Sequence, residues 1–295
     1  MNKGILSGIC AYLLWGLFPI YWKILHHVPA IQIIGHRIVW SFIFLILIVV
    51  SANQWKNFRS AVMSKKVFGI YMVASALLTI NWFVYVWGVN AGRIVETSLG
   101  YFINPLFSVL LGIVFLKEKL RLMQWIPVIL AAAGVIYLTV DYGRVPWIAL
   151  SLAFTFGLYG LVKKTAPLDS LFGLTFETAI AFPFALTYLI FVTTQGTGSF
   201  PQGNAANDLL LVATGIITSV PLLLFAYAVR NIPLSTVGIL QYIAPSIQFL
   251  IGVVVYREDF GKSDMIGFGL VWTALLIFSI ESAGNRSRIK AECKT

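Results

Sequence analysis

Long apolar runs recur along the whole chain and restrict the folds that are open to it. They cover approximately residues 4–25, 30–51, 68–90, 96–116, 123–140, 145–162, 170–193, 209–229, 235–255 and 264–282. A helix needs roughly 20 residues to cross about 30 Å of hydrocarbon, and a backbone in lipid must satisfy its own hydrogen bonds. The runs therefore predict an all-α, polytopic membrane protein with about ten transmembrane helices.

The composition agrees with a surface that faces lipid. Only 11% of the residues are charged, whereas roughly 25% are charged in a typical soluble domain. The net charge of +10 is spread over short clusters between the apolar runs, which argues against a nucleic-acid partner. The cysteines Cys10 and Cys293 do not have the spacing of zinc ligands, so we expect neither a metal nor another cofactor.

The segments between the runs differ in their content of basic residues. If the N-terminus lies in the cytoplasm, 15 of the 21 basic residues fall in cytoplasmic segments and 5 fall on the other side. Membrane proteins carry this excess on their cytoplasmic face. The first run lacks a cleavage site of the signal-peptide kind, so we expect a retained helix. The sequence predicts a protein of the bacterial inner membrane with both termini in the cytoplasm.

The chain contains two copies of one pattern. With a shift of 140 residues, Pro105 aligns with Pro245 and Glu118 aligns with Glu258. Five helices per copy would turn the second copy upside down relative to the first, as in many secondary transporters. We therefore expect a first repeat at 1–143, a second repeat at 144–284 and a basic cytoplasmic tail at 285–295.

Several short motifs resemble the EamA domain of the drug/metabolite transporter superfamily. They are GYFINP at 100–105, FLKEKL at 115–120, QW at 124–125 and Gly134. The stretch YLLWGLFPIYWK at 12–23, followed by GHR at 35–37, resembles the RarD branch of that family. The resemblance spans the chain as two EamA copies. It implies ten helices around a basket-like cavity and transport of metabolites or drugs, usually as export.

Ionisable residues within the apolar runs are candidates for function because charge in a membrane is costly. Arg37 is a candidate anchor for an anionic substrate, and the alternatives are a structural ion pair or contact with headgroups. Glu177 aligns with His36 under a shift of 141 residues, so it would lie across a pseudo-twofold axis from His36 and Arg37. We interpret His36 and Glu177 as candidates for proton coupling, while Glu177 at headgroup level is the alternative.

Asn81, Trp82 and Tyr85 lie midway through the third run. Asn81 must find a hydrogen-bond partner at that depth, which is either the substrate or another helix. Trp82 and Tyr85 are three residues apart on one helical face and could line a cavity that stacks on a flat ligand. Lipid contact and core packing are the alternatives for these aromatic residues.

The two aligned prolines mark a second group of candidates, because each removes a backbone donor and frees a carbonyl in its helix. Irregular backbone in mid-membrane often marks a transport site, although ordinary kinks have the same cause. The candidates beside these prolines are Tyr101, Asn104, Gln241, Tyr242 and Gln248.

Together these features predict a secondary transporter rather than an enzyme. An enzyme would need paired carboxylates, metal-ligand spacing or a nucleophile with its base, and a channel would show a selectivity motif. The partners that we expect are a small-molecule substrate and membrane lipid. Protons and a second copy of the chain stay open as further partners.

Overall fold

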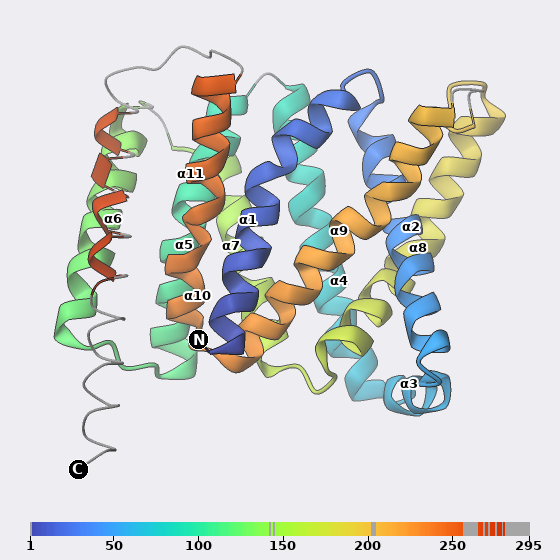
Figure 1. Ribbon diagram of the computed structural model, residues 1–295, viewed down its shortest axis with the longest axis horizontal. Helices are drawn as coiled ribbons and strands as arrows, with labels where there is room; N and C mark the ends of the chain where they lie inside the picture. Colours follow the sequence, from blue (N-terminus) through green and yellow to red (C-terminus); the bar gives the residue numbers. More distant parts are fainter. Residues whose placement is uncertain are drawn as a thin grey trace.

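The computed structural model describes residues 2–91, 93–141, 143, 145–201, 205–255 and, within 265–280, all but residues 268, 271, 275 and 279. Helices are the only regular secondary structure in these residues (Figure 1). The predicted tail 285–295 and Glu258 lie outside them. The prediction of an all-α membrane protein is confirmed, because seven of the described helices are long and apolar enough to cross a membrane.

Each predicted run corresponds to helix in the structure. The first half holds α1 (Lys3–Ile24), α2 (Ala30–Ser51), α3 (Trp55–Val62), α4 (Lys65–Asn90), α5 (Ile94–Leu116) and α6 (Leu122–Asp141). The second half holds α7 (Trp147–Thr165), α8 (Ser170–Thr194), α9 (Ala205–Asn231), α10 (Leu234–Gln241), α11 (Ile243–Leu250) and a π-helical turn (Ile251–Val255). Residues 265–280 are helical wherever they are described.

Helix α3 was not expected, because it falls in a stretch that reads as a polar loop. It has only eight residues and carries Lys56 and Arg59. Its single buried residue, Phe58, packs edge-on against Phe172 and Phe176 of α8. A helix this short depends on such packing rather than on helix propensity, so no apolar run in the sequence predicts it.

The two aligned prolines behave differently. Helix α5 continues through Pro105, whereas the corresponding run in the second half is divided at Tyr242 into α10 and α11, just before Pro245. The irregular backbone that the prolines predict is therefore present in the second half only.

Nine described helices, α10 and α11 counted separately, form a closed ring. The contacts between neighbours run from α1 to α9, α2, α8, α4, α7, α5 and α10, and α11 closes the ring on α1. In Figure 1, α1, α9 and α11 form a layer in front of α4, α5 and α7. Helix α6 lies outside the ring against α5, where Ala131 and Val135 share an apolar cluster with Ala274.

The bundle has two distinct ends. One end carries the connections after α2, α5, α7 and α9, and it lies at the bottom of Figure 1 together with the N-terminus. We call it the basic end, because most described lysines and arginines lie there. Two of its basic side chains bind backbone carbonyls at this end. Arg230 donates to the carbonyl of Ala166 at 2.7 Å, and Lys164 donates to the carbonyl of Ile232 at 2.5 Å.

Glu118 joins the two halves at the basic end. It follows α5, after Lys117 in a left-handed conformation with φ 53°. Its carboxylate accepts hydrogen bonds from the backbone N–H of Leu234 at 2.6 Å and from that of Ser235 at 2.9 Å. These are donors that the first turn of α10 leaves without partners inside the helix, so Glu118 caps a helix of the other half.

Candidate substrate cavity

The ring of helices encloses a cavity of about 270 Å³, which we call the central cavity. Its lining comes from α1, α2, α4, α5, α7, α9, α10 and α11, so both halves of the chain contribute. Eight of the candidates from the sequence line it: Arg37, Asn81, Trp82, Tyr85, Tyr101, Asn104, Gln241 and Gln248. Three do not: His36, Glu177 and Tyr242.

Arg37 holds the only charge on the described lining of this cavity. Its guanidinium carbon lies 4.4 Å from the ring centroid of Trp82 and 5.0 Å from that of Trp22. Its Nε donates to Thr218 Oγ1 of α9 at 2.9 Å. In the described part of the chain no carboxylate forms an ion pair with it. The cation is thus held by aromatic faces and one hydroxyl, and no described carboxylate compensates its charge.

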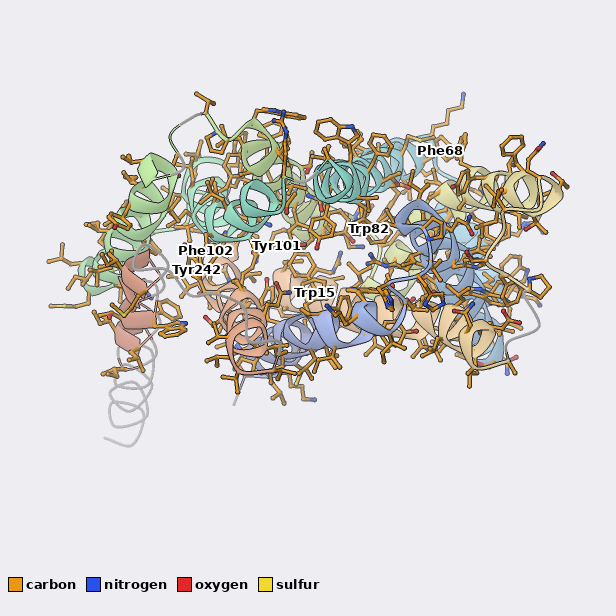
Figure 2. All side chains as sticks on the ribbon, turned by 90° about the horizontal axis from the view of Figure 1, so that it is seen from above. Trp15, Phe68, Trp82, Tyr101, Phe102 and Tyr242 are labelled. Atoms are coloured by element: carbon orange, nitrogen blue, oxygen red, sulfur yellow. The ribbon has the colours of Figure 1, made fainter. Side chains whose placement is uncertain are left out.

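Aromatic side chains form much of the cavity wall. Figure 2, which looks down the bundle, shows Trp15 reaching in from one layer while Trp82 and Tyr101 reach in from the other. Sequence reasoning missed five aromatic residues of this wall: Tyr12, Trp15, Phe18, Trp22 and Phe156. Trp15, Phe18 and Trp22 recur at intervals of three and four residues in the first run, a spacing that places them on one helical face.

Asn81 and Gln248 line the cavity and also hold helices together. Asn81 Nδ2 donates to the Leu152 carbonyl and to Thr155 Oγ1, both at 2.9 Å, and so ties α4 to α7. Gln248 Nε2 donates to the Trp15 carbonyl at 3.0 Å. That carbonyl lies four residues before Pro19, which has no N–H to donate to it. Gln248 therefore supplies the hydrogen bond that the proline removes from α1.

Within the described part of the chain, three polar groups on the lining have no hydrogen-bond partner. Asn104 Oδ1 and Gln241 Oε1 belong to side chains that are only 5% and 6% exposed. The hydroxyl of Tyr12 is fully buried and is also without a partner. Such groups normally find partners when they are buried, within the protein, in bound water or in a ligand.

A larger cavity lies between the central cavity and the end opposite the basic end. It measures about 490 Å³ and is lined by the α1–α2 connection, including His26, His27 and Pro29. We call it the vestibule. The two cavities share four lining residues: Trp22, Arg37, Trp82 and Tyr85. Arg37 and its aromatic neighbours therefore stand where the two cavities meet.

Aromatic packing closes the ring toward the basic end. Tyr12 and Trp15 of α1 contact Phe225 of α9, with centroid distances of 6.4 and 5.6 Å. Phe225 in turn packs against Phe156 at 5.3 Å and stacks on Tyr159 at 6.1 Å. We call these five residues the floor cluster, because they pack together on the side of the central cavity that faces away from the vestibule, and Tyr12, Trp15 and Phe156 line that cavity.

Glu177 lies beyond the floor cluster and has a partner that the sequence did not reveal. Lys163 Nζ donates to its Oε1 at 2.7 Å, and the Tyr159 hydroxyl donates to its Oε2 at 3.0 Å. Glu177 therefore pairs with Lys163 of α7 and not with His36 or Arg37. Tyr159 belongs to both groups and links the carboxylate to the floor cluster.

His36 and Tyr242 point away from the central cavity. His36 is 4% exposed and packs edge-on against Phe200, with ring centroids 5.4 Å apart. Tyr242 is 2% exposed, and its hydroxyl donates to the Phe102 carbonyl at 3.1 Å (both residues are labelled in Figure 2). Tyr242 therefore joins α5 to the break between α10 and α11.

Comparisons with known proteins identify a family. The family model described as "EamA-like transporter family" matches residues 2–140 and again residues 145–280. The chain is 49% identical over 283 residues to "Uncharacterized transporter YojE" of Bacillus subtilis, and the match covers 94% of each chain. It is 39% identical over 287 residues to "Protein RarD" of Escherichia coli, and the match covers 97% of each.

Two more distant matches agree in extent. "Chloramphenicol-sensitive protein RarD" of Pseudomonas aeruginosa is 29% identical over 286 residues, which are 96% of this chain and 95% of that protein. One solved crystal structure, 18% identical in sequence, aligns with a TM-score of 0.70 over 94% of this chain and 97% of its own. The latter shows that the fold is shared.

Proposed function

Because the chain belongs to the EamA-like transporter family, we propose that it is a secondary transporter that exports small metabolites or drugs by alternating access. The relative from Bacillus subtilis is named a transporter, which agrees with a role in transport rather than in catalysis. The observation that carries the proposal is the central cavity. It is enclosed by helices from both halves, meets a vestibule at Arg37 and has the floor cluster on its other side.

Alternating access requires two states of similar energy, which two inverted repeats provide. We propose that residues 1–143 and 144–284 are such repeats. The counterparts are α1 and α7, α2 and α8, α4 and α9, and α5 and α10–α11. Exchanging every helix for its counterpart leaves the order of neighbours around the ring unchanged, because the α1–α9 contact becomes the α7–α4 contact and each other pair likewise maps onto a pair in contact.

Two close helix contacts support the same symmetry. A Cβ atom built on Gly16 would lie 2.8 Å from Ile247, and one built on Gly157 would lie 2.5 Å from Phe107. Gly157 is the counterpart of Gly16 with the 141-residue shift, and Ile247 is the counterpart of Phe107 with the 140-residue shift. Each contact joins one half of the chain to the other. The two halves would move about these two equivalent, closely packed contacts when the protein changes between the inward-open and outward-open states.

The basic end faces the cytoplasm in this proposal, following the positive-inside rule, and the membrane is a bacterial inner membrane. The structure then corresponds to an outward-facing state. The vestibule leads to the periplasmic side, and the floor cluster blocks the cytoplasmic side. Export would require the floor cluster to open toward the cytoplasm for loading and to close behind the substrate.

We propose Glu177 and His36 as proton-coupling residues. Glu177 contacts Lys163 and Tyr159, and Lys163 Nζ also lies 5.6 Å from the ring centroid of Tyr71. Protonation of Glu177 would weaken its attraction to Lys163. It would also change the hydrogen bond between Glu177 and Tyr159, which is part of the floor cluster. His36 contacts the α8–α9 segment through Phe200 and would act at the opposite end.

Counterflow in proteoliposomes tests the proposal. Vesicles are loaded with a defined mixture of aryl carboxylic acids, amino acids and chloramphenicol, and efflux is followed by mass spectrometry. A transporter gives saturable efflux that an opposing gradient of the same compound accelerates. Efflux that rises linearly with concentration would mean a channel, and a new chemical product would mean an enzyme.

A further inference from the structure

The chemistry of the central cavity restricts the class of molecule that fits it. The cavity carries one positive charge, at Arg37, and no acidic residue is found among its described lining residues. The guanidinium is flanked by Trp22 and Trp82, and its Nε is taken by Thr218. Its terminal nitrogens form no ion pair within the described chain. A carboxylate matches the planar guanidinium, which it can bind through two parallel hydrogen bonds.

The same cavity presents acceptors that need donors. Asn104 Oδ1 and Gln241 Oε1 are buried and have no partner among the described residues, and they come from the two aligned runs, α5 and α10. A carboxylate cannot satisfy them, because it has no proton to donate. A ligand that completes the site must therefore also carry an O–H or N–H group. This donor group would form the hydrogen bonds that the two amide oxygens lack.

The donor on the ligand is neutral. An ammonium group would also bond to amide oxygens, but it would add a second positive charge beside Arg37 in a cavity whose described lining holds no carboxylate. Like charges repel more strongly between protein walls than in bulk water, and an ammonium that enters such a cavity loses part of its hydration. The electrostatics thus favour a net anion over a zwitterion or a cation.

The aromatic walls and the volume of the central cavity limit the shape and size of the ligand. Trp15, Trp82, Tyr101 and Phe156 present flat apolar faces, which suit a planar ring. A volume of about 270 Å³ lies below the range of about 300–1,000 Å³ that is typical of drug-sized pockets. A single ring with short substituents matches this volume better than a multi-ring drug does.

We infer that the ligand of the central cavity is a small aryl carboxylate that bears a neutral hydroxyl or amide N–H donor, with its carboxylate on Arg37 and its donor on Asn104 and Gln241. This inference rests on the proposed transport function for its biological meaning. The assignment of the ligand class depends only on the cavity and is tested by binding.

A matched set of compounds tests charge and donor separately. Binding to the purified full-length protein in detergent is measured by calorimetry and thermal shift for 4-hydroxyphenylacetate, 4-hydroxyphenylacetamide, 4-methoxyphenylacetate, 4-hydroxyphenylglycine and tyramine. The acid should bind about tenfold or more tightly than the amide, the zwitterion and the cation, in line with one charge-assisted bond. The methoxy compound should bind several-fold more weakly than the hydroxy compound. Equal affinity of acid and amide, or strongest binding of the zwitterion or the cation, would overturn the inference.

Variants assign the contacts. Arg37→Gln should abolish the preference for the acid over the amide, and Arg37→Lys, which keeps the charge, should retain part of it. Asn104→Leu and Gln241→Leu should each reduce the advantage of hydroxy over methoxy while leaving the acid preference in place. These readouts are ratios between ligands, which a general loss of folded protein does not change. Unchanged ratios in all variants would place the ligand elsewhere.

The binding experiment and the transport experiment can fail independently of each other. If 4-hydroxyphenylacetate binds as expected but neither it nor any other compound tested shows counterflow in proteoliposomes, the transport proposal is wrong and the ligand class stands. If other compounds show saturable counterflow and the acid neither binds nor competes with them, the transport proposal stands and the ligand class is wrong.

Discussion

Lys163 and Glu177 form an ion pair that is shielded from solvent: Nζ lies 2.7 Å from Oε1, and each side chain is 2% exposed. The pair ties α7 to α8 near the basic end. Taking two charges out of water is costly, so neither residue can be removed without leaving the other uncompensated.

Breaking this pair should strongly destabilise the protein. Glu177→Leu and Lys163→Met should each lower the free energy of unfolding by about 3–5 kcal/mol, because a single buried charge remains. The double variant should recover much of the loss, since no charge is then buried. Thermal unfolding in detergent, followed by size-exclusion chromatography, measures the effect. A Glu177→Leu protein as stable as the parent would show that the ion pair contributes nothing.

Counterflow should depend on the planar shape of the Arg37 side chain as well as on its charge. The ammonium group of Arg37→Lys cannot stack flat between Trp22 and Trp82 and cannot form two parallel hydrogen bonds. We expect counterflow to fall about tenfold or more, which corresponds to the loss of about one charge-assisted hydrogen bond. The protein should still fold, because Arg37 forms no ion pair within the described residues.

Arg59→Lys is the matched control for Arg37→Lys. Arg59 is exposed on α3 and lies outside both cavities. Its replacement should leave counterflow unchanged. Full activity of Arg37→Lys would remove Arg37 from the substrate path, and low abundance of that variant alone would assign Arg37 to folding.

The sequence predicts the long helices well and the orientation of their side chains poorly. A run of about 20 apolar residues has almost no alternative to a spanning helix, because its backbone must bond internally. The side chains are harder to place, since neighbours such as His36 and Arg37 point about 100° apart on a helix. Sequence alone does not tell which of them meets a cavity, and the structure places only Arg37 on the lining.

Lys163 illustrates the other limit. Lys163 and Lys164 read together as a basic loop, yet Lys163 is buried against Glu177 while Lys164 bonds to the end of α9. The sequence gives no sign of the difference, because it depends on how α8 packs against α7. Likewise, the unpartnered oxygens of Asn104 and Gln241 become visible only when the surrounding helices are in place.

Glu118 should stabilise the junction between the halves. It accepts hydrogen bonds from two backbone N–H groups of α10 and from the Ser235 hydroxyl. Glu118→Ala should cost about 1–3 kcal/mol, the range for leaving buried donors unpaired. Glu118→Gln keeps one acceptor and should cost less. Chemical unfolding in mixed detergent micelles gives the comparison.

Asp169 offers a control for the capping argument. It caps α8 within its own half by accepting from the Phe172 N–H at 2.8 Å. Asp169→Ala should cost about 1 kcal/mol, as for an ordinary N-cap. If Glu118→Ala costs no more than Asp169→Ala, the cap between the halves has no special weight.

The glycines at the two symmetric contacts should resist substitution. Gly16→Ala would place a methyl group against Cβ of Ile247, which cannot move without the backbone, whereas Gly157→Ala meets the ring of Phe107. We expect losses of about 1–3 kcal/mol from overpacking, and the larger loss at Gly16. Gly69→Ala is the matched control, because no atom lies within 4 Å of the added methyl group. It should be neutral or stabilise α4 by up to about 1 kcal/mol, owing to helix propensity.

Gln248 and Pro19 should be coupled through the Trp15 carbonyl. Gln248→Leu removes the donor to that carbonyl and should cost about 1–3 kcal/mol, because a buried acceptor is left unpaired. Pro19→Ala restores a backbone N–H that can donate to the same carbonyl from within α1. In the Pro19→Ala background, Gln248→Leu should therefore cost at least about 1 kcal/mol less. A double-mutant cycle of unfolding free energies measures this coupling, and strictly additive effects would mean that Gln248 does not replace the hydrogen bond that Pro19 removes.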